Sequence, residues 1–269
     1  MKLTKAIENF FAFFGRAYYK IMDAMSALGE FIIFQIKLLP LYFTPPYRIK
    51  EIFAQIEIIG INSTGVIALT AIFTGMVEAV QLYQGFHKFG AESMMGYTIF
   101  ISITKELGPV FGALMLTSRA ISAMAAELGT MRVTEQIDAI DTLAVNSKKY
   151  LIIPRIVATT ISAPVLIIIF DFLANVSSYI ISTVALGVNP EAYKNTIETF
   201  LEFSDIGTGL IKAVVFGFLI SSIGTYIGYF TRGGARGVGK STTQAVVYSA
   251  VVIFGANYIL SSIFLYLDW

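Results

Sequence analysis

The sequence contains no cysteine, one histidine and one tryptophan among its 269 residues. The absence of cysteine excludes disulfides, thiolate metal sites and cysteine nucleophiles. A single histidine, His87, cannot form a multi-histidine metal site, and we expect no metal to be bound. Charged residues are also scarce, at 14%, and the formal net charge of +1 gives no reason to expect a nucleic-acid partner.

What the sequence has instead is apolar residues, which make up 56% of the chain and give a mean hydropathy of +0.72. This content is well above that of an ordinary soluble domain. We therefore predict an all-α integral membrane protein formed by one domain, residues 1–269. Within it we expect an interfacial N-terminal region, residues 1–50, and a membrane core, residues 51–269.

The N-terminal region lacks the basic stretch, apolar core and small-residue cleavage site of a signal peptide. Its aromatic residues are interleaved with charged ones, which predicts an amphipathic helix in the membrane interface, or else a packed helix at the edge of the bundle. Residues 28–43 are apolar but short against the ~20 residues that a crossing needs. We expect an interfacial or re-entrant segment there. The aromatic residues in question are Phe10, Phe11, Phe13, Phe14, Tyr18 and Tyr19.

Five longer apolar runs predict five transmembrane helices, at about residues 56–80, 94–128, 152–186, 206–230 and 244–267. The second run is too long for a straight crossing of ~30 Å at ~1.5 Å per residue. Pro109 predicts where it breaks, because the proline ring clashes with the carbonyl of Lys105 and cannot donate a hydrogen bond. Lys and Arg are concentrated on the side of the N-terminus, which predicts a cytoplasmic N-terminus and a periplasmic C-terminus.

Four ionisable residues lie in or beside the second run: Lys105, Glu106, Arg119 and Glu127. Such groups are costly in hydrocarbon and usually face a partner or a cavity. Glu106 and Arg119 are ~20 Å apart along a helix, and Arg119 and Glu127 are ~12 Å apart. We therefore expect their partners on other helices, in a second copy of the chain or in a ligand, and both substrate contact and structural pairing stay open. Glu78 is either a headgroup-level carboxylate or a functional one.

Two further segments fall outside the apolar runs. Residues 129–150 place apolar residues at helical spacing among acidic ones, which predicts an amphipathic cytoplasmic helix that lies on the membrane or docks into a partner. Gly234–Ser241 fits the phosphate-loop pattern G-x-x-x-x-G-K-[ST]. This motif binds nucleotide phosphates inside an α/β domain, but here membrane spans lie on both sides of it. We therefore interpret it as a basic turn that binds no nucleotide.

The central segment KELGPVFGALMLTSRAISAMAAELGTMRVTEQIDAIDTLAVNSKKYLIIPRIVA closely resembles the signature of the MlaE-type ABC permeases. TPPYRIKEIFAQIEIIGINS, FTGMVEAVQ and GGARGVGKSTTQAVV extend this resemblance over about residues 44–250. The resemblance implies a permease in the bacterial inner membrane that forms a homodimer and is not itself an enzyme. It also implies a separate cytoplasmic ATPase that binds ATP and Mg, and a periplasmic Mce-type protein that exchanges phospholipid with the permease.

The resemblance also assigns roles to residues. A conformational relay would run through Pro109, Arg119 and Glu127, and a coupling helix for the ATPase would cover about 130–143. Glu78 replaces the apolar residue usual in the family's motif. The implied lipid-binding residues are Met76, Val77, Glu78, Val80, Gln81, Lys105, Glu106 and Phe111. The implied ATPase-coupling residues are Arg132, Val133, Glu135, Gln136, Ile137, Asp138 and Ile140.

Other functional classes stay open on the residues alone. A secondary transporter or channel would use Glu78, Glu106, Arg119 and Glu127 as an ion relay, and it would work without an ATPase. A membrane-embedded enzyme is disfavoured because no metal cluster or nucleophile–base pair stands out. A purely structural scaffold would hold no lipid.

Overall fold

The computed structural model describes residues 2–267, with side chains at positions 18, 19, 22, 23 and from 25 onwards. Every element in this range is helical, which confirms the all-α fold. The chain divides into two compact units, residues 1–47 and 48–269. Six helical stretches of the described chain are long and apolar enough to cross a membrane, one more than the sequence predicted.

The additional stretch lies in the first unit. A single helix, α1, runs from Lys2 to Phe43 and continues through Pro40, and its segment Met25–Phe43 has the length and composition of a span. The sequence prediction had started this segment at residue 28. Including Met25–Ala27 gives 19 helical residues, about 28 Å at 1.5 Å per residue. Of the aromatic residues in the predicted pattern, Tyr18 and Tyr19 are exposed. The side chains of the others, Phe10, Phe11, Phe13 and Phe14, lie outside the described residues.

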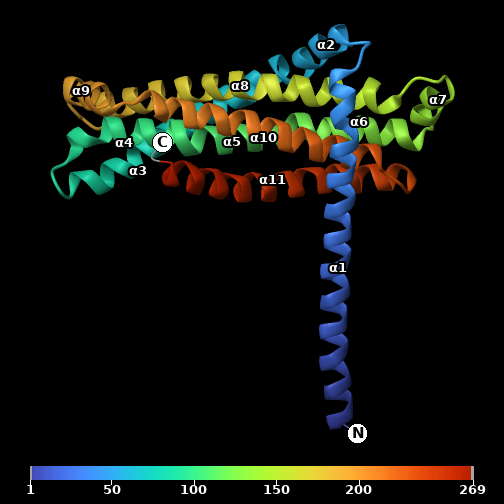
Figure 1. Ribbon diagram of the computed structural model, residues 1–269. Helices are drawn as coiled ribbons and strands as arrows, with labels where there is room; N and C mark the ends of the chain where they lie inside the picture. Colours follow the sequence, from blue (N-terminus) through green and yellow to red (C-terminus); the bar gives the residue numbers. More distant parts are fainter. Residues whose placement is uncertain (1, 268–269) are drawn as a thin grey trace. The chain divides into compact units, whose positions relative to one another are not determined.

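The second unit contains the five predicted spans. The first consists of α2 (Ile49–Ile59), the short η1 (Ile61–Ser63) and α3 (Thr64–His87). The third consists of the π-turn η5 (Lys148–Ile152), α8 (Ile153–Ile180) and the π-turn η6 (Ile181–Ala185). The fourth and fifth are α10 (Phe203–Tyr229) and α11 (Gly234–Tyr266). These helices run alongside one another in Figure 1.

The second span is broken twice, as its length requires. After η2 (Glu92–Met94), α4 (Met95–Ser102) passes into the π-turn η3 (Ile103–Leu107) and then α5 (Gly108–Leu116). A second π-turn, η4 (Thr117–Ile121), leads into α6 (Ser122–Val133). η3 ends two residues before Pro109, so the regular α-helix is interrupted where Pro109 predicted it. π-turns insert one residue into a helix and are frequent at functional sites.

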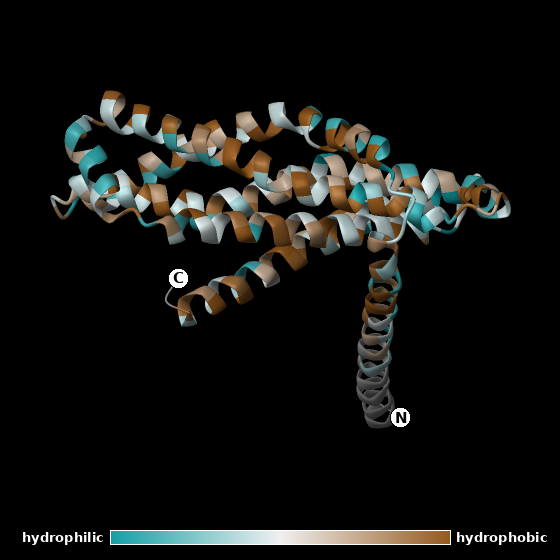
Figure 2. Ribbon diagram, turned by 45° about the horizontal axis from the view of Figure 1, so that its top comes forward, coloured by the Kyte–Doolittle hydropathy of each residue, from teal (hydrophilic) through white to brown (hydrophobic). Residues whose placement is uncertain are grey.

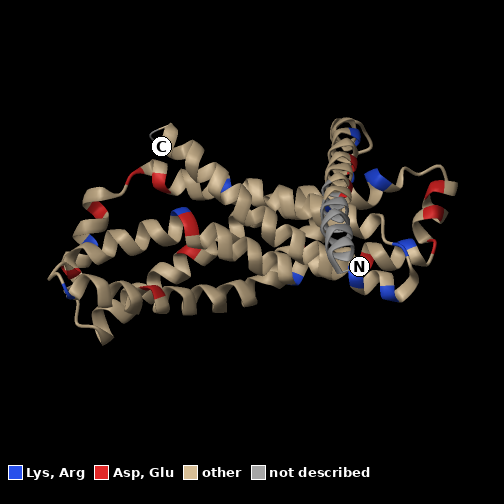
Figure 3. Cartoon of the chain, turned by 90° about the horizontal axis from the view of Figure 1, so that it is seen from below, with Lys and Arg blue, Asp and Glu red and all other residues tan. Residues whose placement is uncertain are grey.

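Two short helices, α7 (Gln136–Thr142) and α9 (Pro190–Phe200), lie at opposite ends of this unit (Figure 1). α9 falls in a segment that the sequence analysis treated as a loop. It begins with the Asn189 side chain, which accepts hydrogen bonds from the backbone N–H groups of Glu191 and Ala192. Figure 2 shows hydrophobic residues along the long helices, and Figure 3 shows charged residues near the helix ends together with a few inside the helices.

The glycine-rich segment that fits the phosphate-loop pattern is helical. Gly233 and Gly234 adopt positive φ values of 92° and 65°, and α11 begins directly at Gly234. Residues 234–241 therefore form the first two turns of a membrane helix, and only residues 230–233 form the expected turn. Their backbone is not free to wrap around a phosphate group.

Small residues set the contacts between the long helices. A Cβ atom on Gly75 of α3 would lie 2.0 Å from the Ala174 carbonyl oxygen of α8. Next to it, Ser177 Oγ donates a 3.0 Å hydrogen bond to the Ile72 carbonyl. Glycine and serine allow membrane helices to approach closely, and the interhelical hydrogen bond fixes their register.

This contact gives a stability prediction. Gly75→Ala forces α3 and α8 apart, and we expect roughly 1–3 kcal/mol of destabilisation from overpacking. Gly65→Ala on the same helix is the control, because a Cβ there meets no atom within 4 Å. Thermal unfolding in detergent measures both. Equal melting temperatures for the two variants would contradict the role of Gly75.

Candidate functional site

The centre of the candidate site is the backbone of the broken second span. Pro109 has no N–H group, so it cannot donate a hydrogen bond to the Lys105 carbonyl four residues earlier. In hydrocarbon no water replaces the missing donor. Lys212 of α10 supplies it, with Nζ 2.9 Å from the Lys105 carbonyl oxygen. A side chain from another helix thus compensates the break.

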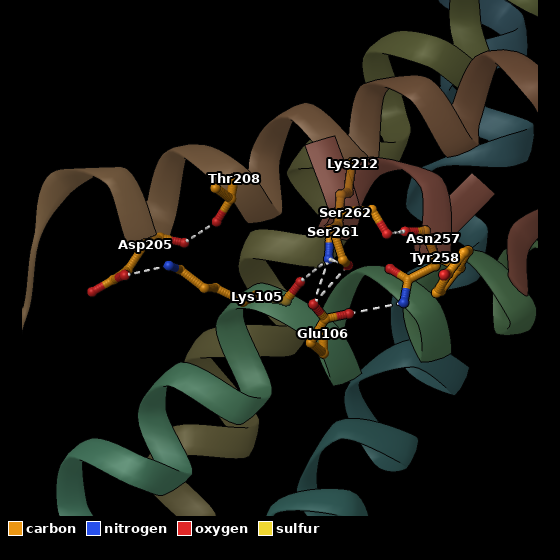
Figure 4. A network of polar contacts seen from close by, with 9 residues as sticks. All are labelled: Lys105, Glu106, Asp205, Thr208, Lys212, Asn257, Tyr258, Ser261 and Ser262. Atoms are coloured by element: carbon orange, nitrogen blue, oxygen red, sulfur yellow. Dashed lines mark hydrogen bonds and ion pairs between the residues drawn. The ribbon is translucent and has the colours of Figure 1, made fainter. Parts of the chain in front are cut away.

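Lys212 also forms an ion pair with the same turn. Its side chain is 1% exposed, and Nζ lies 2.7 Å from Glu106 Oε1 and 2.8 Å from Ser261 Oγ of α11. Ser261 Oγ donates to Glu106 Oε1 at 2.9 Å, and Asn257 Nδ2 donates to Glu106 Oε2 at 2.8 Å. Figure 4 shows these groups converging on Glu106. The buried ammonium is satisfied, as a charge at this depth must be.

Lys105 forms a separate ion pair. Its Nζ lies 2.7 Å from Asp205 Oδ1, and the Lys105 side chain extends away from Glu106 and Lys212 in Figure 4. Asp205 stands in the first turn of α10, where its Oδ2 also accepts a hydrogen bond from the Glu202 backbone N–H at 3.0 Å. The turn η3 is therefore tied to α10 through two neighbouring side chains that point in different directions.

α10 approaches η3 closely because of a glycine. A Cβ atom on Gly209 would lie 2.2 Å from the Thr104 carbonyl oxygen. Gly209 lies between Asp205 and Lys212 on α10, so the close approach positions both ion pairs.

A groove about 490 Å³ in volume lies beside the broken span. Its wall combines residues of α3 with Leu107 and Phe111, and an adjoining groove continues along α3. Ser102 donates a 3.0 Å hydrogen bond to Glu78 Oε1, which links the two helices. The predicted lipid-binding residues that line these grooves are Met76, Val77, Glu78, Val80, Gln81 and Phe111.

Lys105 and Glu106 do not line the grooves. They directly precede Leu107, which does, and their side chains are held by α10 and α11. The structure thus separates the predicted set into an apolar wall and a charged turn next to it.

Arg119 and Glu127 have partners on other helices, which confirms that expectation. Arg119 Nη1 donates to the Ile58 carbonyl and to Ser63 Oγ, each at 3.1 Å. Glu127 Oε1 lies 2.8 Å from Arg155 Nη2 on α8. The second π-turn is therefore joined to the first span, and α6 to the third.

The predicted coupling segment is not one helix over 130–143. α6 continues to Val133, and Glu135 then adopts φ 62° before α7 begins at Gln136. A left-handed residue ends helical hydrogen bonding, which physically separates the two helices. Arg132 bridges the corner, with Nη1 2.6 Å from Asp138 Oδ1, and Ile137 is fully buried. Gln136 and Ile140 share α7 with Ile137.

Several partners at this site went unrecognised in the sequence. They are Asp205, Lys212, Asn257, Ser261 and Arg155. A lysine well inside an apolar run was a usable signal for Lys212. Asn257 and Ser261 carried no such signal, because polar side chains in membrane helices often hydrogen-bond within their own helix.

No group of three His, Cys, Asp or Glu side chains in the described part of the chain is arranged to hold a metal ion. The chemistry available at the site is that of apolar contact, hydrogen bonding and buried ion pairs. The fold and the site define a multi-pass helical membrane protein with a polar centre beside an apolar groove.

A family model described as Permease MlaE matches residues 52–263. The chain therefore belongs to the MlaE permease family.

Relatives share most of its length. A probable ABC transporter permease protein of Rickettsia bellii is 41% identical over 88% of this chain and 92% of its own length. The intermembrane phospholipid transport system permease protein MlaE of Haemophilus influenzae is 31% identical over 97% and 95%. The chloroplastic protein TRIGALACTOSYLDIACYLGLYCEROL 1 of Arabidopsis thaliana is 38% identical over 78% and 60%.

The ion pair of Glu106 and Lys212 gives a stability prediction. Glu106→Leu leaves a buried ammonium without its carboxylate, and we expect roughly 3–5 kcal/mol of destabilisation. Lys212→Met removes the buried charge, so adding it to Glu106→Leu should restore part of the loss, and the remainder reflects the Lys105 carbonyl that loses its donor. A double-mutant cycle by thermal unfolding measures this, and additive losses would contradict the pairing.

Proposed function

We propose that this chain is the permease subunit of an ABC transporter that moves phospholipid between the inner membrane and a periplasmic Mce-type carrier. Family membership supports the permease class, and the printed name of the Haemophilus relative supports phospholipid as cargo. A separate cytoplasmic ATPase, holding ATP and Mg, drives the movement. This chain itself hydrolyses nothing and binds no cofactor.

The observation that carries the proposal is the groove beside a charged turn. Val77 and Phe111 offer apolar contact to acyl chains, while Gln81 and Glu78 add polar groups to the same wall. Lys105 and Glu106 directly precede Leu107 of the groove wall, and we assign the headgroup to the side of the groove next to this charged turn. A groove of about 490 Å³ is of the size that holds a small ligand, and it takes part of a two-chain lipid.

The rest of the lipid needs a second wall. Val66, Leu69 and Phe73 leave a long apolar face of α3 exposed next to the groove. Exposed apolar faces of this kind mark interaction sites. A second copy of the chain, placed against this face, completes a cavity between two grooves.

The coupling role belongs to the corner between α6 and α7. α6 is the last section of the broken span, so a push on this corner is transmitted along the same helix toward Arg119, Pro109 and the groove. We place the corner in the cytoplasm, the N-terminus with it, and the C-terminus in the periplasm, because of the distribution of Lys and Arg.

Reconstitution tests the proposal as a whole. The complex with its ATPase is placed in vesicles containing labelled phospholipid, and transfer to a purified Mce-type acceptor is followed with and without ATP. We expect transfer that requires ATP. Ion flux through vesicles containing the lone chain would favour the secondary transporter or channel instead.

Filling the groove should block transfer. Val77→Trp places a large ring in both grooves, and we expect at least about a tenfold loss of transfer rate. Val165→Trp on α8 is the control, because Val165 is also exposed but belongs neither to the groove lining nor to the exposed face of α3. Equal transfer by the two variants in the reconstituted assay would exclude the groove as the lipid path.

Charge reversal should release the ATPase. Glu135→Lys with Asp138→Lys puts two positive charges on the corner, and we expect loss of co-purification and of ATPase stimulation. Arg132→Met breaks the same internal ion pair without adding a positive charge, and it should retain association. ATPase binding by the charge-reversed variant at the wild-type level would refute the docking assignment.

A further inference from the structure

Asp171 of α8 is a carboxyl group that the site described above does not use. Its Oδ1 atom is buried and accepts no hydrogen bond from any residue that the structure describes. Asp171 lies inside a membrane span, where no water is available to satisfy it. A buried acceptor without a donor is costly, so its place in the fold requires a reason.

The carboxyl group faces the broken second span. A Cβ atom on Gly108 would lie 1.7 Å from Asp171 Oδ1, so only glycine leaves room for it there. Thr104, one turn earlier, lines the same cavity of about 460 Å³ as Asp171, and its buried Oγ1 also lacks a hydrogen-bond partner among the described residues. Two unsatisfied polar atoms therefore meet at the π-turn η3.

Two cations are candidates for the missing donor. Lys194 lines the same cavity, but its Nζ stands 5.3 Å from the Tyr179 ring. Tyr179 lies eight residues after Asp171, about 12 Å farther along α8. Lys105 does not line this cavity while it pairs with Asp205, but it precedes Gly108 by three residues, a spacing that leaves side chains about 5–6 Å apart on a helix. Its four-carbon stem spans that separation.

The π-turn explains how Lys105 would change direction. It holds one extra residue, and each residue of an α-helix advances by about 100°. Lys105 immediately follows Thr104, which faces the Asp171 cavity. A shift of the turn by one residue therefore carries Lys105 to the angular position that Thr104 now occupies.

Asp205 tolerates the departure of Lys105. Its Oδ2 accepts the Glu202 backbone N–H, and it stands in the first turn of α10, where the helix dipole favours a negative charge. Asp171, in the middle of α8, has neither compensation. The two carboxyl groups thus differ in how much they need the lysine.

We propose that Asp171 is the second carboxyl partner of Lys105: when η3 changes register, Lys105 leaves Asp205 and pairs with Asp171. The broken helix then has two defined positions, each held by its own ion pair. The proposal rests on the proposed function in one respect, because the exchange is taken as a step of the ATP-driven cycle.

Cross-linking tests the exchange directly, since the chain has no native cysteine. Thr104→Cys is combined with Asn175→Cys, two positions that line the Asp171 cavity, so that Lys105, Asp171 and Asp205 are all kept. A short bifunctional thiol reagent is added to the complex with the ATPase, and we expect the 104–175 yield to fall several-fold on trapping with ATP and vanadate, because the register shift moves residue 104 away from the cavity. The pair Ile168→Cys with Leu210→Cys, on α8 and α10 at the same cavity, is the control and should not change. A 104–175 cross-linking yield that is the same with and without nucleotide would overturn the exchange.

A second test measures the transfer of labelled phospholipid by full-length variants in which only Asp171 or Lys105 is changed. Asp171→Asn should lower transfer about tenfold without lowering the melting temperature of the resting protein, because Asp171 has no partner there. Added to Lys105→Met, it should cause no further loss, whereas a merely structural role would give additive losses. Wild-type transfer by Asp171→Asn, or additivity, overturns the proposal.

The two tests separate this inference from the proposed function. If the wild-type complex moves no phospholipid but the cross-linking yields of the cysteine variants still change with nucleotide, the cargo is refuted and the exchange is supported. A complex that moves phospholipid with unchanged cross-links would do the reverse.

Discussion

The membrane core depends on how one backbone carbonyl, that of Lys105, is satisfied. Pro109 removes its donor inside a span, where water cannot take over. Lys212 of α10 provides the replacement, and a buried ammonium in turn needs an anion. Glu106, the residue after Lys105, is that anion, and its carboxylate accepts hydrogen bonds from Asn257 and Ser261 of α11. The interactions that replace one missing backbone hydrogen bond therefore link the second, fourth and fifth spans.

The same break places the parts of a permease on one continuous piece of chain. The groove residues Leu107 and Phe111 lie directly beside the charged turn, and the helix continues through a second π-turn to the corner at Arg132. π-turns are single-turn insertions in a helix and are frequent at functional sites, and the two in this span are its candidate points of movement. A mechanical link between a cytoplasmic ATPase and a lipid groove requires this combination of stiffness and defined points of movement.

Local chemistry accounts for the features that were predicted correctly. Apolar length gave the five core spans, and the covalent geometry of Pro109 gave the position of the break. The errors also have local causes. α9 lies between two predicted spans and was missed, because its residues are polar and only Asn189-Pro190 indicates a helix start. The left-handed Glu135 divides a segment whose apolar spacing indicated one helix, because spacing carries no information about a single φ angle.

The sequence by itself determined the all-α membrane fold, the break near Lys105 and the need of Glu106, Arg119 and Glu127 for distant partners, because these follow from hydrophobicity, helix rise and proline geometry. Only the tertiary structure decided which partners they have. Lys212 reaches Glu106 across 106 positions, and Arg155 reaches Glu127 from the next span. Such pairs depend on how close two helices approach, which small residues such as Gly209 and Gly108 set through contacts far away in the chain. For the same reason, nothing short of the packed structure places Asp171 beside the broken helix.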